Sequence, residues 1–215
     1  MKSTRSRSKT STVVTSRAWR KVLTALVVVL GVGGCGSTEH ASQPTAPPAR
    51  LLAEARPIGR GPDFQPPVRG PVIGPCARDL GYRAGVHVEV FGANRVVLIP
   101  AGIGTTPPRA VLSGRITSAG CYGALVTLDP TGLVLVRPGT RLTLGDLFRS
   151  WGQRLSSRRV ATFSAPAGDH LRVFVDGRRW RAAPVEIPLR AHSEIVVEVG
   201  QYVPPHSSYA FPPGS

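Results

Sequence analysis

His87 and Glu89 lie two residues apart in the run Val86-His-Val-Glu-Val90, and both side chains are of types that bind transition metals. Valines alternate with them, as in a half-buried strand, so the imidazole and the carboxylate should share one face. A metal site needs a third ligand and usually a fourth, and His170 or His192 is a candidate for either place. The competing interpretation, which the sequence alone favours, is an exposed polar face opposite the valines.

No catalytic motif accompanies these residues. The sequence contains neither a Gly-x-Ser-x-Gly nucleophile elbow nor a His-Glu-x-x-His metalloprotease motif. A hydrolase triad using His170 or His192 stays open as an alternative, because triad members converge in space and not in sequence. We expect a protein that is not an enzyme and that uses no cofactor.

The N-terminal segment has the pattern of a secretory signal. Residues 1–21 hold seven basic residues and no acidic one, and an apolar run from Val22 to Gly34 follows. That run is shorter than the roughly 20 residues that a membrane-spanning helix needs. Its end, Val32-Gly-Gly-Cys35, resembles the bacterial lipobox, in which an aliphatic residue and two small residues precede a cysteine.

The lipobox resemblance implies a lipid anchor. Signal peptidase II would remove residues 1–34, and Cys35, diacylated on its thiol, would begin the mature chain. Two acyl chains, such as palmitate, hold a protein on a bilayer far more firmly than one. We expect attachment to the extracytoplasmic side of the cell membrane; the alternative is an ordinary signal that is cleaved further along.

The segment 35–75 is rich in proline and shows neither helical nor strand periodicity, so it predicts an extended tether. Beyond it, Cys76 and Cys121 are the two cysteines that remain once Cys35 is lipidated. Export implies an oxidising compartment, in which a disulfide between them is the default. Two free or metal-binding thiols are the competing interpretation.

Residues 76–203 predict one α+β domain that is mostly β, with residues 204–215 as an irregular tail. Pairs of apolar runs flank turn residues, which predicts antiparallel hairpins around Gly92–Asn94, Asp129–Gly132 and Asp176–Gly177. A last strand covers Glu194–Val199. These features predict a small disulfide-stapled domain, either β-grasp-like or sandwich-like.

One short helix is well marked in the sequence. Thr143 and Asp146 form a capping-box pair, and Gly152 suits the left-handed residue that follows a helix. Apolar residues recur between them at helical spacing, which gives the helix one apolar face. They are Leu144, Leu147, Phe148 and Trp151.

The formal charge of +15 does not by itself indicate a nucleic-acid partner. Outside residues 1–21, 20 arginines face 12 acidic residues, an excess that would favour anionic lipid or an anionic envelope polymer. Gly177-Arg-Arg-Trp-Arg181 joins three guanidinium groups to an aromatic ring, but outside the cell it predicts a charged edge strand. An anionic polymer or an envelope protein could dock there.

Short motifs in residues 76–212 resemble a family of uncharacterised secreted or lipid-anchored bacterial proteins. They are Pro100-Ala-Gly-Ile-Gly104, Cys121-Tyr122, Leu142-Thr-Leu-Gly-Asp-Leu-Phe-Arg-Ser-Trp-Gly152 and Val173-Phe-Val-Asp-Gly177. The resemblance implies the fold, the disulfide and a metal site built on a His-x-His pair and a His-Thr-His-Asp run.

This sequence departs from the family pattern at the metal-binding positions. It has His87 and then Glu89 in the first motif, and Val126-Thr-Leu-Asp129 in the second, so only Asp129 survives of the later run. We therefore expect a non-catalytic, lipid-anchored envelope protein with a binding or assembly role. The alternative is an extracytoplasmic transition-metal-binding protein using His87, Glu89 and Asp129.

Overall fold

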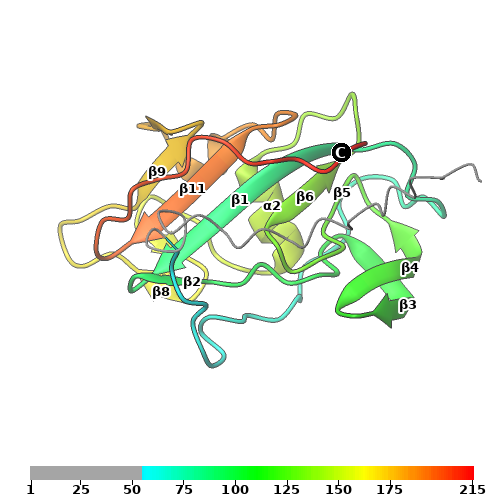
Figure 1. Ribbon diagram of the computed structural model, residues 1–215, viewed down its shortest axis with the longest axis horizontal. Coiled ribbons are helices and arrows are strands. Elements are labelled where there is room, and N and C mark those ends of the chain that lie inside the picture. Colours follow the sequence, from blue (N-terminus) through cyan, green and yellow to red (C-terminus); the bar gives the residue numbers. More distant parts are fainter. Residues whose placement is uncertain (1–54) are drawn as a thin grey trace, which may run out of the picture. The chain divides into compact units, whose positions relative to one another are not determined.

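The alternation of Val86, Val88 and Val90 produces the central strand of the domain, β1 (Ala84–Gly92). The computed structural model describes residues 55–215; Cys35 and the predicted signal lie outside them. In this part of the chain the structure is a mostly-β domain with one short α-helix, as the sequence predicts, and its main sheet is mixed. The sheet follows the order β10-β9-β11-β1-β6-β5, with β2 also paired to β1 (Figure 1).

The predicted hairpins all form. They are β1 with β2 (Arg95–Val96), β5 (Leu125–Val126) with β6 (Leu133–Val136), and β9 (Arg172–Val175) with β10 (Arg178–Arg179). The two central residues of the first and last turns have positive φ, as the two-residue turns favoured in hairpins require. They are Ala93 and Asn94 in one turn and Asp176 and Gly177 in the other.

The pairing of β1 with β11 (Glu194–Val199) is parallel, whereas the sequence predicts a domain of antiparallel hairpins. The paired residues His87 and Glu194 are 107 positions apart in the sequence, and no turn between the two strands predicts the pairing. The register sets His87 beside Glu194 and Val90 beside Val197. The first and last strands of the domain therefore lie together at the middle of the sheet.

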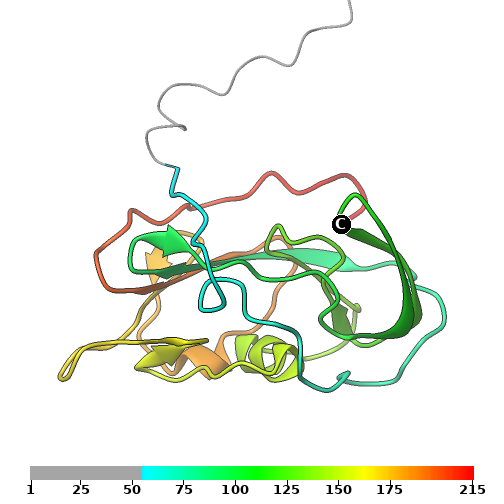
Figure 2. The ribbon, with the colours of Figure 1, turned by 90° about the horizontal axis from the view of Figure 1, so that it is seen from below.

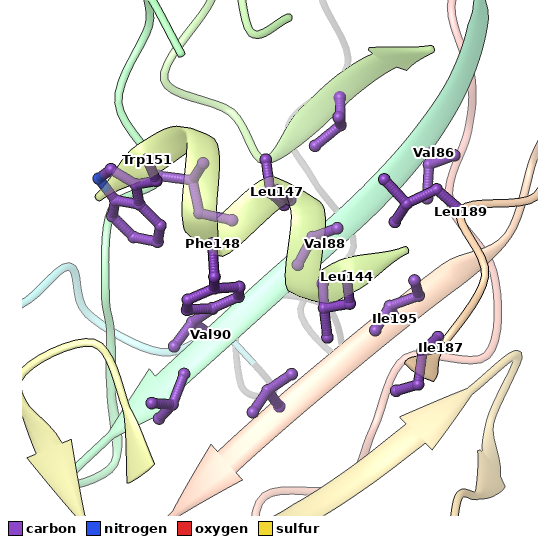
Figure 3. Close-up of a cluster of buried hydrophobic side chains, with 14 of the residues drawn as sticks. Val86, Val88, Val90, Leu144, Leu147, Phe148, Trp151, Ile187, Leu189 and Ile195 are labelled. Carbon is purple, nitrogen blue, oxygen red and sulfur yellow. The ribbon is translucent and has the colours of Figure 1, made fainter. Parts of the chain in front are cut away.

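The predicted helix is α2 (Leu144–Trp151), and it covers one face of the sheet (Figures 1 and 2). Thr143 and Asp146 form the capping box, and Gly152 ends the helix with φ of 79°. The apolar face of α2 packs on the inward side chains of β1 and β11 (Figure 3). Trp151 is fully buried, and its indole N–H donates to the carbonyl of Pro66 at 3.0 Å.

The domain extends further toward the N-terminus than the predicted boundary at residue 76. Residues 57–75, assigned to the tether from their prolines, hydrogen-bond to β2 through Pro57 and Gly59 and to α2 through Arg69 and Pro71. Their backbone is irregular but packed. The proline composition of residues 57–75 correctly predicts a lack of regular structure. It does not predict that the segment packs against β2 and α2.

The hairpin β3 (Thr105–Leu112) and β4 (Arg115–Tyr122) was not foreseen. Pro107 and Pro108 interrupt its sequence, and the register shifts between Thr106 and Arg109. Most of its residues are exposed on both faces, so no apolar alternation marks it. The predicted disulfide between Cys76 and Cys121 is present and ties β4 to the segment that precedes β1.

Three short elements complete the fold. They are the strand pair β7 (Arg159–Val160) and β8 (Phe163–Ser164), and the 3-10 helix η1 (Pro184–Glu186). The chain after β11 then returns over the face of the sheet opposite α2, where Figure 2 shows it as the red segment. Both faces of the central strands are therefore covered.

Removing the capping hydroxyl should destabilise the domain. The Thr143 hydroxyl accepts from the backbone N–H of Asp146 at 3.3 Å, so Thr143→Ala removes that acceptor and leaves the N–H only the backbone carbonyl of Thr143, at 3.0 Å. We expect a loss of about 1 kcal/mol in the free energy of unfolding, and a loss of a few tenths for Thr143→Ser. Urea unfolding followed by the fluorescence of buried Trp151 measures both. Equal losses would contradict the capping role.

Candidate metal centre

The parallel register of β1 and β11 builds the candidate site. Val86, Val88 and Val90 face α2, so His87 and Glu89 project from the opposite face of β1. On β11, Ile195 and Val197 face the helix in the same way, and Glu194 projects beside His87. The sheet thus places one imidazole and two carboxylates side by side.

One ligand atom from each of His87, Glu89 and Glu194 lies within 4.8 Å of the others. The Nδ1 atom of His87 is 2.7 Å from Oε2 of Glu194. The other ring nitrogen, Nε2, donates to the carbonyl of Thr131 at 2.9 Å. A histidine that ligates a metal commonly donates its second ring N–H to a carbonyl, which fixes the orientation of the ring.

Gly132 allows this carbonyl to approach the imidazole. Its φ is +83°, and a Cβ atom there would lie 2.4 Å from the carbonyl oxygen of Val88 and 3.1 Å from Nε2 of His87. The predicted Asp129–Gly132 turn therefore does more than join β5 to β6, because it supplies the acceptor that orients His87.

The C-terminal segment covers the site. The ring of Tyr209 stacks on His87 with centroids 3.8 Å apart and an interplanar angle of 8°. His206 lies 2.9 Å, Nδ1 to Oε2, from Glu89. His87 is only 6% exposed, so the expectation of an exposed polar strand face is wrong. Tail residues that no strand or helix includes exclude solvent from this face.

Glu194 is almost fully buried, yet its contacts do not satisfy both of its carboxylate oxygens. The residue is 1% exposed, and its Oε1 atom has no hydrogen-bond partner among the described residues. A buried carboxylate oxygen without a partner is costly, and buried charges are normally paired or bound to metal. The free oxygen belongs to the same carboxylate that meets His87, so it adds an unused acceptor to the group.

The pKa values of His87 and Glu194 are both raised, which favours retention of a proton by the pair. Burial by itself lowers the pKa of His87, but the hydrogen bond and the negative charge of Glu194 outweigh burial and raise it. Burial raises the pKa of Glu194, and its hydrogen bond to His87 offsets that rise only in part. The pair therefore holds one proton to a higher pH than an isolated histidine would.

The structure brings together two of the three predicted metal-ligating residues. His87 and Glu89 belong to the group, but Asp129 forms an ion pair with Arg115 instead, and Glu194 takes the third place. Asp129 is held elsewhere because β4 brings the Arg115 guanidinium to the turn that carries it. The residues that converge are therefore His87, Glu89 and Glu194, without Asp129.

The other histidines named from the sequence do not join the group. His192 is hydrogen-bonded to the carbonyl of Ser215 at 2.6 Å, and His170 is exposed. His206 was overlooked because it lies in the irregular tail. The sequence did contain a pattern that indicates Glu194. This residue alternates with the apolar residues of its strand, so it lies on the other face of that strand, which the chain must also cover.

The predicted lipidation site, Cys35, lies outside the described residues. Among residues 55–215, no helix has the length and apolar character needed to cross a membrane. Cys76 and Cys121 form the disulfide, as expected, so neither offers a free thiol as a metal ligand. The disulfide agrees with an extracytoplasmic location.

Comparison with protein-family models, with curated proteins and with solved structures finds no match to this chain. The resemblance to secreted bacterial proteins therefore stays a prediction. The chemistry of the site rests on the residues themselves and on their geometry.

Without metal, the buried pair should lose stability as the pH rises. The pKa of His87 lies above its ordinary value of 6.5, so the stabilisation is fully present below pH 6.5 and is lost as the pH passes the raised pKa. We expect the stability advantage of the native chain over His87→Gln to shrink as the pH rises above 6.5. Urea unfolding in the presence of a chelator measures this difference.

The matched control is His170→Gln, which alters an exposed histidine. Its difference from the native chain should stay constant over the same range. An advantage of His87 that grows with pH would mean that burial of the imidazole outweighs its pairing with Glu194.

Proposed function

We propose that this chain is a lipid-anchored, extracytoplasmic protein that binds a divalent transition-metal ion through His87, Glu89 and Glu194 and has no catalytic role. The observation that carries the proposal is the convergence of the three ligand atoms within 4.8 Å on a buried face, where one carboxylate oxygen of Glu194 has no hydrogen-bond partner in the described part of the chain. The lipobox-like sequence before Cys35 supports the location.

The donor set suits a borderline metal. One imidazole nitrogen and two carboxylates are ligands that Zn²⁺ accepts at about 2.0–2.2 Å, and imidazole also suits Cu²⁺ and Ni²⁺. Two carboxylates would neutralise the charge of a divalent ion in a face shielded from water. His206, hydrogen-bonded to Glu89, is the nearest candidate for a fourth ligand.

Metal would replace the proton that the pair now shares. The Nδ1 atom of His87 faces Glu194, while Nε2 is committed to the carbonyl of Thr131. Loss of the Nδ1 proton frees a lone pair directed at the carboxylates, which is the position a metal needs. Binding should therefore release a proton and weaken as the pH falls.

The covered position of the site supports binding rather than catalysis. Tyr209 lies against the imidazole and His206 against Glu89, so the tail covers the imidazole and one of the carboxylates. With His206 as a fourth ligand the set would be closed, as is typical of structural sites, whereas catalytic metals keep an open position. This arrangement agrees with the absence of catalytic motifs in the sequence.

Glu194→Gln should abolish most of the metal affinity. The change removes a negative charge and a ligand oxygen while keeping the size of the side chain, and we expect Zn²⁺ affinity to fall about 100-fold or more. Isothermal titration of the full chain in detergent measures it. Thermal unfolding gives a second readout, since about 100 Kd of free metal should stabilise the native protein by about 2.7 kcal/mol.

Glu198→Gln is the matched control. Glu198 lies on the same face of β11, is equally buried and likewise has an Oε1 atom without a hydrogen-bond partner among residues 55–215, but its Oε2 atom pairs with Arg172 at 3.2 Å. Its change should leave Zn²⁺ affinity within about threefold of the native value, as should Asp129→Asn. Equal losses in Glu194→Gln and Glu198→Gln, or no binding of Zn²⁺, Cu²⁺ or Ni²⁺ to the native chain, would refute the proposal.

Cys35→Ala tests the anchor separately. The change removes the thiol that would carry the acyl chains, so we expect the protein to leave the membrane fraction and to lose metabolic palmitate label. Ser37→Ala, two residues further on, should retain both. Membrane retention of Cys35→Ala with undiminished label would contradict lipidation at this residue without bearing on the metal site.

A further inference from the structure

A second candidate site lies at the edge of the sheet, beside β9 and β10. A hollow of about 450 Å³ is lined by Leu171, Val173, Arg179, Trp180 and Arg181, among others. An adjoining hollow of about 500 Å³ shares His170 and Arg179 with it and adds Arg172. Volumes of about 300–1,000 Å³ are typical of small-molecule sites. Together the two hollows offer room for a ligand longer than a single ion.

The lining is positively charged and in part unneutralised. Arg172 has Glu198 as its ion-pair partner. Arg179 and Arg181, in contrast, have no carboxylate within ion-pair distance among residues 55–215. Burial, together with the charges of Arg172 and Arg181, lowers the pKa of Arg179. An anion placed between these guanidinium groups would relieve their mutual repulsion.

The same hollow has an apolar side. Trp180 is half-buried, and its indole N–H donates to the carbonyl of Ala183 at 3.4 Å, which holds the ring in place. Leu171 and Val173 are buried beside it. The guanidinium of Arg179 donates to the carbonyl of Leu171 at 3.3 Å and lies over the ring of Phe174, 5.4 Å from its centroid. A lining that holds both an aromatic ring and guanidinium groups suits a ligand that combines a flat, weakly polar surface with negative charge. A sugar ring that bears a carboxylate has both.

An acidic peptide added as a further strand fits this edge less well. β10 contains only two residues, and the backbone N–H of Trp180 already donates to Val173 at 2.8 Å. Pro184, which follows in the lining, has no N–H to donate. The edge therefore offers few free backbone groups for strand addition.

We infer that the hollows around Arg179, Trp180 and Arg181 bind an acidic saccharide, with the guanidinium groups on its carboxylates and the indole against a sugar ring. This site lies apart from the proposed metal centre, since no residue that lines it belongs to the His87, Glu89 and Glu194 group. A specific ligand class is thereby assigned to the run Gly177–Arg181, which the sequence predicts to be a charged edge strand.

The test uses the full chain in detergent and tetragalacturonate as the probe, with binding followed by titration calorimetry and by Trp180 fluorescence. Galactotetraose is the neutral control, and hexaglutamate represents an acidic peptide. We expect tetragalacturonate to bind and the other two to bind at least about tenfold more weakly. Equal binding of galactotetraose, or tighter binding of hexaglutamate, would overturn the assignment.

Charge variants test the location. The double change Arg179→Gln with Arg181→Gln should weaken tetragalacturonate binding about tenfold or more. Arg95→Gln with Arg190→Gln removes the same charge from exposed positions elsewhere and should weaken binding by no more than about twofold. Equal weakening by the two double variants would show only non-specific attraction to a basic surface and would overturn the proposal.

Two further variants separate the parts of the proposal. Trp180→Phe keeps an aromatic ring and should retain most of the affinity, whereas Trp180→Leu, which keeps an apolar side chain against the core, should lose it. His87→Gln, which removes the proposed metal ligand, should leave tetragalacturonate binding unchanged. Loss of saccharide binding in His87→Gln would make the two sites one and would contradict this inference.

Discussion

The parallel pairing of β1 with β11 is the constraint on which the rest of the structure depends. Because paired residues of a sheet project to the same side, the register that opposes His87 and Glu194 also aligns the inward valines of β1 with Ile195 and Val197. One register thus builds the hydrophobic core and the candidate site at once. A slip of one residue would exchange the two faces and bury the charged groups under the helix.

The two faces of the sheet are covered by different means. Helix α2 brings a continuous apolar surface to one face, including Leu144, Phe148 and Trp151 (Figure 3). The other face mixes charged residues with a small apolar cluster around Phe91, Phe174 and Val203, and irregular chain covers it. Irregular chain suits a mixed face because each of its side chains can contact a different kind of group. Tyr209 stacks on an imidazole, and His206 is hydrogen-bonded to a carboxylate.

Two carboxylates on this face of β11 differ in what surrounds them. Glu198 has the guanidinium of Arg172 and the N–H of Val203 as partners, whereas Glu194 has an imidazole that shares one proton with it. A guanidinium keeps its proton under all ordinary conditions, but an imidazole can give its proton up to a metal. The choice of partner, and not burial, therefore separates a structural carboxylate from a candidate ligand.

Local patterns in the sequence determined the helix, its caps and the turns of three hairpins, because each depends on residues within a few positions. The disulfide was predictable because residues 55–215 contain only two cysteines. The shared face of His87 and Glu89 was predictable for the same reason. The tertiary structure alone decided that Glu194 replaces Asp129, that the tail covers the site, and that β1 pairs with β11. Those outcomes depend on contacts between segments far apart in the chain, and local periodicity does not indicate which distant segments will meet.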